Sequence, residues 1–226
     1  MREDHWLGER LGAVALTWEP GDDPTVLVAE ARRRSPAFAQ ARVPCSDVAT
    51  AGALESAGFR VLDVSITLRR PAGGEAPGGA CEVADARPEQ RASLLAIASG
   101  HYRVSRFHMD PLIAPAIADQ IKRDWLAAHL DGERGVRLLV GSVASRPVGF
   151  LGVLAPERGV HVIDLIAVHA DARGAGVGEA LVRTLLAAPG QRVDVGTQAA
   201  NTRAIRFYER LGFQTVETRY VLHLHA

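Results

Sequence analysis

Residues 168–179 read VHADARGAGVGE, a stretch that leaves an apolar, strand-like run and enters a helix-like one. Gly174, Gly176 and Gly178 alternate with larger residues in it, so three of these positions lack a Cβ atom. Without Cβ atoms, successive backbone N–H groups can converge on one anion at the positive end of the following helix. We therefore expect this loop to bind a diphosphate.

The glycine loop alone leaves two other interpretations open. A dinucleotide-binding domain carries such a loop after its first strand, with an acidic residue about 20 residues further on. Here the loop comes late in the chain, after several expected strands, and no P-loop lysine follows it. The stretch could also be a glycine-rich turn that binds no ligand.

A second block, VGTQAANTRAIRFYERLGF at residues 195–213, places Asn201 where it can cap a helix and Gly212 where it can end one. Together the blocks resemble the GNAT superfamily of N-acetyltransferases. The pattern R-G-x-G-x-G at 173–178 is similar to its acyl-CoA pyrophosphate loop, and N-x-x-A-x-x-x-Y-x-x-x-G-F at 201–213 to its last helix. This resemblance covers residues 81–226.

The resemblance implies an N-acetyltransferase with acetyl-CoA as co-substrate and no metal. It also implies that the expected strand 160–168 splays from the next strand, where N–H groups near Ile166 and Val168 hold the pantetheine and polarise the acyl carbonyl. The cofactor-binding residues that follow from it are Ile166, Val168, Arg173, Gly174, Ala175, Gly176, Val177, Gly178, Asn201 and Arg206.

Composition divides the chain into an N-terminal partial α/β domain (residues 1–68), a Pro/Gly-rich linker (69–80) and an acetyltransferase domain (81–226). The first part reads as a βαβαβ unit, with strands at 11–18, 38–43 and 60–68 and helices at 24–34 and 46–57. The second part reads as strands at 81–84, 135–144, 147–154, 160–168, 191–197 and 213–225. Its four expected helices are one that begins at 88, one at 111–130, one that ends near 186 and one at 201–211. This order predicts a mixed-sheet α/β (α+β) fold. By resemblance it is the GNAT acyl-CoA N-acyltransferase fold with a smaller N-terminal segment.

One pattern occurs twice. LESAGF at residues 54–59 and ERLGF at 209–213 each read as a helix, a glycine stop and a strand. Any helix-to-strand corner can look this way, and so can a degenerate half-copy of the second part. The sequence leaves both explanations open.

The composition excludes several classes of protein. The chain has 226 residues, 26 basic and 26 acidic, so it lacks the positive field that drives nucleic-acid binding. It contains no run of ~18 apolar residues that could span a membrane, and its charged first residues do not form a secretion signal. Cys45 and Cys81 have no metal-type spacing and are expected to be buried thiols. We expect a cytoplasmic protein.

Tyr208 is the expected catalytic acid, which would protonate the leaving thiolate. A core tyrosine that bonds the backbone is the alternative. A base is harder to place, because an amine with a pKa near 8 is already about one-tenth neutral at pH 7. A water relay to a carboxylate would suffice, and Asp63, His161 and Asp164 are the candidates.

A narrower resemblance links the chain to the TDP-fucosamine acetyltransferase family within the superfamily. Residues 195–202, Ser105-Arg106-Phe107, Trp125 and the N-terminal segment carry it. This resemblance implies that the acceptor is the amino group of a TDP-linked 4-amino-4,6-dideoxyhexose, such as TDP-4-amino-4,6-dideoxy-D-galactose. It also implies direct attack without an acyl-enzyme, and a homodimer.

Within that family Tyr208 matches the acid, and Asp63 stands where the relatives have a glutamate proposed as remote base. Asp63 is one methylene shorter, which favours a bridging water. Arg106 and Phe107 are the expected substrate-binding residues. The Arg106 guanidinium suits a diphosphate, and Phe107 or Trp125 could stack on a base. A surface ion pair between Arg106 and an acid such as Asp110 is the alternative.

Two rival functions remain at this stage. One is a non-catalytic acyl-CoA-binding module, and the other is an N-acetyltransferase of a free small-molecule amine, such as an aminoglycoside. The phosphate loop, Asn201 and Tyr208 occur together, which favours an enzyme because a sensor needs no proton donor. The balanced charge is a mild argument against a polycationic substrate.

Overall fold

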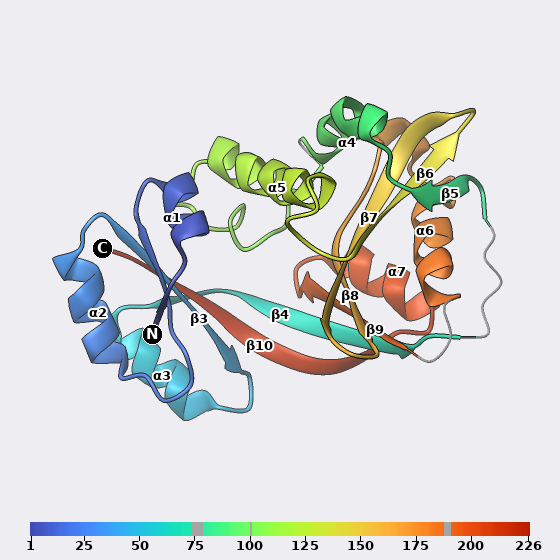
Figure 1. Ribbon diagram of the computed structural model, residues 1–226. Coiled ribbons are helices and arrows are strands. Elements are labelled where there is room, and N and C mark those ends of the chain that lie inside the picture. The colour runs from blue at the N-terminus through green and yellow to red at the C-terminus, as the bar shows by residue number, and fades with distance from the viewer. Residues whose placement is uncertain (74–78, 100, 188–190) are drawn as a thin grey trace.

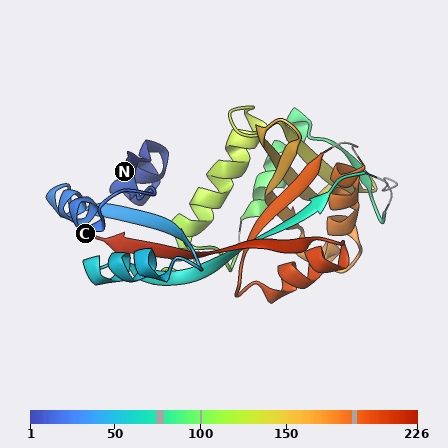
Figure 2. The same cartoon turned by 90° about the horizontal axis from the view of Figure 1, so that it is seen from below.

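The computed structural model describes residues 1–73, 79–99, 101–187 and 191–226 (Figures 1 and 2). Within these residues ten strands form one mixed sheet in the order β1-β2-β3-β10-β4-β9-β8-β7-β6-β5. Helices cover both faces of this sheet, which confirms the expected mixed α/β fold. Residues 74–78 of the predicted linker lie outside the described residues, and the linker's first residues, 69–71, belong to β4.

The first part of the chain has the expected βαβαβ order, preceded by a short strand and helix that the sequence did not predict. Asp4 caps that helix by accepting a hydrogen bond from the Leu7 N–H, and Gly12 ends it in a left-handed conformation. Seven residues are too few for a clear apolar period, which explains the miss. The elements are β1 Arg2–Glu3, α1 His5–Leu11, β2 Val14–Thr17, α2 Pro24–Arg33, β3 Ala37–Pro44, α3 Val48–Ala57 and β4 Arg60–Pro71.

The second part has the expected elements with one difference. The helix expected from residue 111 begins at Pro115, because the Asp110 carboxylate accepts the Leu112 N–H and holds the preceding residues in a turn. The elements are β5 Glu82–Asp85, η1 Pro88–Gln90, α4 Arg91–Ala98, α5 Pro115–Leu130, β6 Arg137–Val143, β7 Arg146–Glu157, β8 Val160–Val168, η2 Ala170–Ala172, α6 Val177–Leu186, β9 Arg192–Gln198, α7 Thr202–Arg210 and β10 Gln214–His225.

The two halves of the sheet are covered in the same way. On the N-terminal side, α2 and α3 pack on one face, and α1 and α5 pack on the other through a core that includes Phe38, Phe107 and Ile121. On the C-terminal side, α6 and α7 share one core with β7, β8 and β9, and α4 and α5 cover the opposite face. Helix α5 therefore spans both halves on one side of the sheet (Figure 1).

The halves exchange their long strands. Strand β4 lies between β10 and β9, and β10 lies between β3 and β4, so each half completes the other's sheet (Figure 2). Arg219 pairs with Pro44, and Ser65 pairs with Gln198. Ser65 and Arg219 are 154 residues apart, as are Pro44 and Gln198. The pairing of β3 with β10 thus has the same register as the pairing of β9 with β4. The run β2-α2-β3-α3-β4 is repeated as β8-α6-β9-α7-β10.

This register favours the half-copy explanation of the repeated LESAGF and ERLGF corners, which lead into β4 and β10 respectively. The predicted domain boundary at residue 68 falls inside β4, the strand through which the two parts share their sheet. A helix long and apolar enough to cross a membrane is not found among the described residues.

Candidate active site

Strands β8 and β9 separate halfway along their length. Their parallel pairing runs from Val160 opposite Arg192 to Ile163 opposite Val195 and then stops. Beyond that point β8 stays paired with β7 as far as Val168, and β9 stays paired with β4 as far as Gln198. The two strands therefore splay, as expected, and leave backbone groups of β8 without a neighbouring strand.

Ile166 and Val168 point their backbone groups into this splay. The His169 N–H donates to the Val148 carbonyl of β7 at 2.8 Å. Since hydrogen-bonding sides alternate along a strand, the N–H and C=O groups of Ile166 and Val168 face away from β7. The Tyr102 hydroxyl, which donates to the Ile166 carbonyl at 3.3 Å, confirms this direction. Both N–H groups can thus bond a pantetheine amide or an acyl carbonyl.

The glycine loop joins β8 to α6 at the open end of the splay. Gly174 and Gly176 have φ angles of +82° and +78°, in the left-handed region. The Ala180 N–H is the first to bond back to the helix start, at the Gly176 carbonyl. The N–H groups of residues 177–179 therefore have no backbone acceptor within the described residues, which fits a diphosphate at this helix end.

Arg173 is held at the mouth of the loop. Its Nη2 atom donates to His101 Nδ1 at 3.1 Å, and its Nε atom to the Val168 carbonyl at 3.4 Å. Burial and the positive charge of Arg173 lower the pKa of His101 to about 4. His101 is therefore a neutral acceptor at physiological pH, and it positions the Arg173 guanidinium without adding a counter-charge.

The repeated half lacks this anion site. In place of the glycine loop, the corner before α2 carries Asp22 and Asp23, and the Asp23 carboxylate caps the helix. These negative charges would repel a phosphate. Leu54, fully buried, stands where the second half has Tyr208. The repeat has kept the fold without the residues expected to carry the chemistry.

Tyr208 lies on α7 under the splayed strands. Asn201 caps that helix by accepting the Ala204 N–H at 3.2 Å, as predicted. The tyrosine ring is 3% exposed and packs edge-on against Phe207 and Phe213, with centroids 5.0 and 5.3 Å away. Burial raises its pKa.

The Tyr208 hydroxyl makes no hydrogen bond to another described residue, so it is available as a proton donor. Burial raises the pKa of Tyr102. Tyr208 lies close to it, and a negative charge on Tyr208 would raise that pKa further. Arg206, which the resemblance assigned to the cofactor, is exposed on the same helix as Tyr208. Tyr102 and His101 were missed by sequence reasoning, because they lie in a loop without a motif.

The structure separates the three candidate bases. Asp164 accepts hydrogen bonds from His129 at 2.9 Å and from Arg134 at 2.6 and 2.8 Å. Burial alone would raise the pKa of Asp164, but these bonds outweigh it and lower the pKa to about 2. His161 pairs with Val193, before the strands separate. Asp164 is therefore fully bonded. His161 lies outside the splay, although its buried Nδ1 atom has no hydrogen-bond partner among the described residues.

Asp63 is the candidate that retains a free oxygen. Its side chain is 7% exposed, and its Oδ2 atom is buried with no hydrogen-bond partner among the described residues. Burial raises its pKa, against a backbone hydrogen bond from Val64. On the sheet Asp63 lies opposite Val221, which in turn lies opposite Arg42. Asp63 and Arg42 therefore share one face of the sheet.

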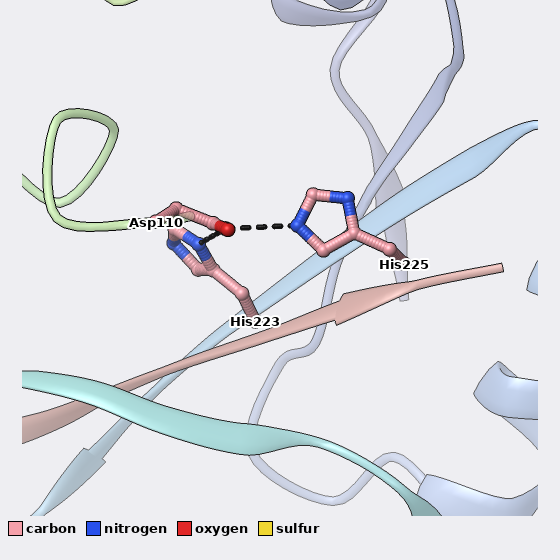
Figure 3. Close-up of side chains that lie close together, drawn as sticks. All are labelled: Asp110, His223 and His225. Carbon is pink, nitrogen blue, oxygen red and sulfur yellow. Dashed lines mark hydrogen bonds and ion pairs between the residues drawn. The ribbon is translucent and has the colours of Figure 1, made fainter. Parts of the chain in front are cut away.

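Arg106 does not form the ion pair with Asp110 that the sequence left open. Asp110 instead accepts hydrogen bonds from His223 Nδ1 at 2.7 Å and His225 Nε2 at 2.8 Å, through the same oxygen (Figure 3). Among the described residues these three side chains are near enough to hold a metal ion. Burial, and to a lesser extent the charge of Arg106, lowers the pKa of His223 against the hydrogen bond to Asp110. We describe the three side chains as a hydrogen-bonded network. This network ties the loop before α5 to β10.

Phe107 is fully buried, at 0% exposure, and its ring lies 4.5 Å below the Arg106 guanidinium and 6.0 Å from Trp125. It has no free surface for a nucleobase. We therefore assign Phe107 to the core that supports Arg106, in place of the substrate contact expected from the sequence. Trp125 is half-buried and stacks on Trp6 at 5.9 Å.

Three further cations gather beside Arg106, and sequence reasoning missed them. Lys122, the only lysine of the chain, lies on α5 with its ammonium 4.2 Å from the Trp125 ring and 5.2 Å from the Tyr102 ring. Burial and the charges of Arg106, Arg134 and Arg42, opposed by Asp164, together lower the pKa of Lys122 to about 7. We call Arg42, Arg106, Lys122 and Arg134 the cationic cluster.

A splayed strand pair beside a glycine-rich helix start, with a buried tyrosine beneath it, is the arrangement expected for an acyl-CoA binding site. The Acetyltransferase (GNAT) family model matches residues 102–213 of the chain. This match agrees with the family expected from the two sequence motifs.

A curated protein is similar to this chain in sequence. The spore coat polysaccharide biosynthesis protein SpsD of Bacillus subtilis (strain 168) is 28% identical over 147 residues, which are 63% of this chain and 50% of that protein. The chain thus spans half the length of this curated relative.

Solved structures support the fold. A conserved protein of unknown function from Staphylococcus epidermidis matches with a TM-score of 0.66 at 16% identity, over 90% of this chain and 78% of that one. A GCN5-related N-acetyltransferase from Sphaerobacter thermophilus matches with a TM-score of 0.60 at 14% identity, over 87% and 64%.

Proposed function

We propose that this protein is an acetyl-CoA-dependent N-acetyltransferase that acetylates the amino group of a nucleotide-linked amino sugar, such as a TDP-linked 4-amino-4,6-dideoxyhexose. The observation that carries the proposal is the splay between β8 and β9, with the phosphate loop at its open end and Tyr208 beneath it. The name of SpsD, a polysaccharide biosynthesis protein, supports a sugar as the acceptor.

In the proposed reaction the acceptor amine attacks the thioester carbonyl directly. A carbon–nitrogen bond forms and the carbon–sulfur bond breaks. The N–H groups of Ile166 and Val168 stabilise the developing oxyanion, worth about 3 kcal/mol for each such donor. Tyr208 donates its proton to the departing sulfur. Burial raises the pKa of Tyr208, and the same dry surroundings raise that of the thiol, so the transfer stays feasible.

The amine loses a proton to water, and Asp63 is the proposed end of that relay. Its free buried oxygen and the upward shift of its pKa suit a carboxylate that accepts a proton through water. Neither Cys45 nor Cys81 takes part in direct attack, and both are free, half-buried thiols.

The test is thiol release from acetyl-CoA by the purified chain. TDP-4-amino-4,6-dideoxy-galactose, its glucose epimer and a panel of free aminoglycosides are compared side by side. We expect a TDP-sugar to be preferred by a factor of about a hundred. Turnover with free amines only would contradict the proposed sugar-nucleotide acceptor. Acetyl-CoA binding without turnover of any amine would contradict the proposed transferase activity.

A further inference from the structure

The cationic cluster joins the two halves of the protein on one face of the sheet. Arg42 comes from β3 in the first half, Arg106 from the loop after α4, and Lys122 from α5. Arg42 points to the sheet face that α5 covers, because it lies four residues after Phe38, which packs on that face, and the alanines between them pack under α2 and α3. Charges distant in sequence thus meet on one surface.

Three of the four cations in the cluster lack an ion-pair partner, whereas Arg134 pairs with Asp164. Asp4 and Asp164 act on Arg106 and Lys122 only as nearby charges, without an ion pair. Arg42, Arg106 and Lys122 form no ion pair with any described residue, and the Nε atom of Arg106 is buried without a hydrogen-bond partner. The nearby Asp164 is already bonded by Arg134 and His129. A charge removed from water without a partner costs free energy, and like charges add to that cost.

The repulsion agrees with the direction of the pKa shifts. Burial, together with Arg42 and Arg134 and against the charge of Asp4, lowers the pKa of Arg106 to about 9. Burial and Arg219 also lower the pKa of Arg42. Yet the side chains remain reachable, since Arg42 is exposed and Arg106 and Lys122 are half-buried. An anionic ligand would relieve the strain of this arrangement.

We propose that Arg42, Arg106 and Lys122 form a diphosphate-binding subsite that holds the nucleotide end of the acceptor while its amine faces the splay. Two planar guanidinium groups and one ammonium match the several oxygens of a diphosphate better than a single carboxylate. A cationic amine such as an aminoglycoside would be repelled.

The position of the subsite fits such an acceptor. Strand β3, which carries Arg42, is separated from β9 at the splay by β10 and β4. Three strand spacings put roughly 14 Å between the backbones of β3 and β9. The long Arg42 side chain brings its guanidinium closer to the splay, so that the remaining distance approaches the length of a hexose. The phosphate loop at Arg173 lies on the other side of the splay, beyond β8, so the two diphosphates do not compete.

The inference rests on the proposed function for its acceptor, but its test does not use turnover. Isothermal titration with thymidine diphosphate, without acetyl-CoA, is carried out on the full chain and on Lys122→Gln and Arg42→Gln. Arg123→Gln, an exposed neighbour on α5, is the charge-matched control. We expect a loss of affinity of tenfold or more in the first two variants and less than twofold in the control.

Thermal unfolding of each variant accompanies the titration. Removing a mutually repelling cation should leave the melting temperature unchanged or higher, so lost affinity cannot be ascribed to misfolding. Absence of binding by the full chain, or equal losses in Arg123→Gln, would overturn the subsite even if thiol release with amino sugars is observed. Binding without thiol release toward any amine would instead leave the subsite standing and overturn the transferase.

Discussion

Ser65 on β4 lies directly opposite Arg219 on β10, and its hydroxyl donates a hydrogen bond to the Arg219 carbonyl oxygen at 3.3 Å. Since equivalent positions of the repeated halves are 154 residues apart, this pair lies at the centre of the exchanged strands. Two residue positions further along, Asp63 on β4 and Arg42 on β3 flank Val221 on one face of the sheet. Strand exchange therefore brings residues of the proposed acceptor site together.

The second part should not fold alone. Residues 81–226 without β4 would leave β9 and β10 without the strand that pairs with both, and unpaired edges invite aggregation. We expect this fragment to be insoluble or to lack a cooperative unfolding transition by circular dichroism. Co-expression of residues 1–73 with residues 79–226 should restore a soluble complex. A cooperative transition in the isolated fragment would contradict this view of the fold.

Tyr208→Phe should lower turnover by about 10² to 10⁴ with little change in acetyl-CoA affinity, because the proton donor is lost and the ring is kept. The matched control is Tyr102→Phe, which removes a neighbouring hydroxyl that bonds the Ile166 carbonyl. We expect less than a tenfold effect there. If steady-state kinetics show the larger loss in Tyr102→Phe, the acid is Tyr102.

Gly176→Ala should destabilise the phosphate loop. Its φ of +78° is strained for any residue with a Cβ atom, at about 1–2 kcal/mol, and that atom would lie 3.2 Å from the Ala80 Cβ. Acetyl-CoA affinity should fall with it. Gly178→Ala is the control for stability, since its Cβ would meet Phe207 at an ordinary 3.6 Å. Urea unfolding of the two variants checks the difference, and equal stability would refute the strain.

Asp63→Asn should raise the stability of the protein while it lowers its activity. Burial raises the pKa of Asp63, so the folded protein loses stability as the pH rises through that pKa and the buried carboxyl ionises. The neutral amide avoids this cost, and the urea midpoint should rise more at pH 8 than at pH 4.

Turnover of Asp63→Asn should fall by about 10- to 100-fold at pH 7. The loss should shrink at high pH, where the acceptor amine is already neutral. A loss of turnover that is the same at every pH would make Asp63 a residue that positions the acceptor.

Lys122 should make nucleotide binding depend on pH. With a pKa of about 7, the free protein loses this charge above pH 7, whereas the bound anion holds the proton on. Affinity for thymidine diphosphate should then fall by up to about tenfold per pH unit above 7. Lys122→Arg keeps its charge and should flatten the profile. Identical profiles for the two proteins would show that Lys122 does not contact the ligand.

The sequence predicted local structure well where the residues that determine it lie within one short stretch. The glycines of 173–178 and the cap at Asn201 act within a few residues, so the loop, α6, α7 and the order of the strands could be recognised. Helix α1 was missed because seven residues show no period. The start of α5 was misplaced because the turn at Asp110 depends on a side chain's hydrogen bond.

The substrate side of the site lay beyond such reasoning. Arg106 was found through its neighbours in sequence, but Phe107 beside it is core, and Lys122 and Arg42 carry no motif.

By itself, the sequence indicated the family and predicted the glycine loop and the place of the tyrosine on its helix, because these depend on backbone conformation over one turn or one strand. The tertiary structure alone decided which charges meet. Exchange of β4 and β10 brings Asp63 and Arg42 onto one face, and α5 places the Lys122 ammonium over the Trp125 ring. Coulomb interaction depends on distance in space and on burial, and neither quantity is written in the order of the residues.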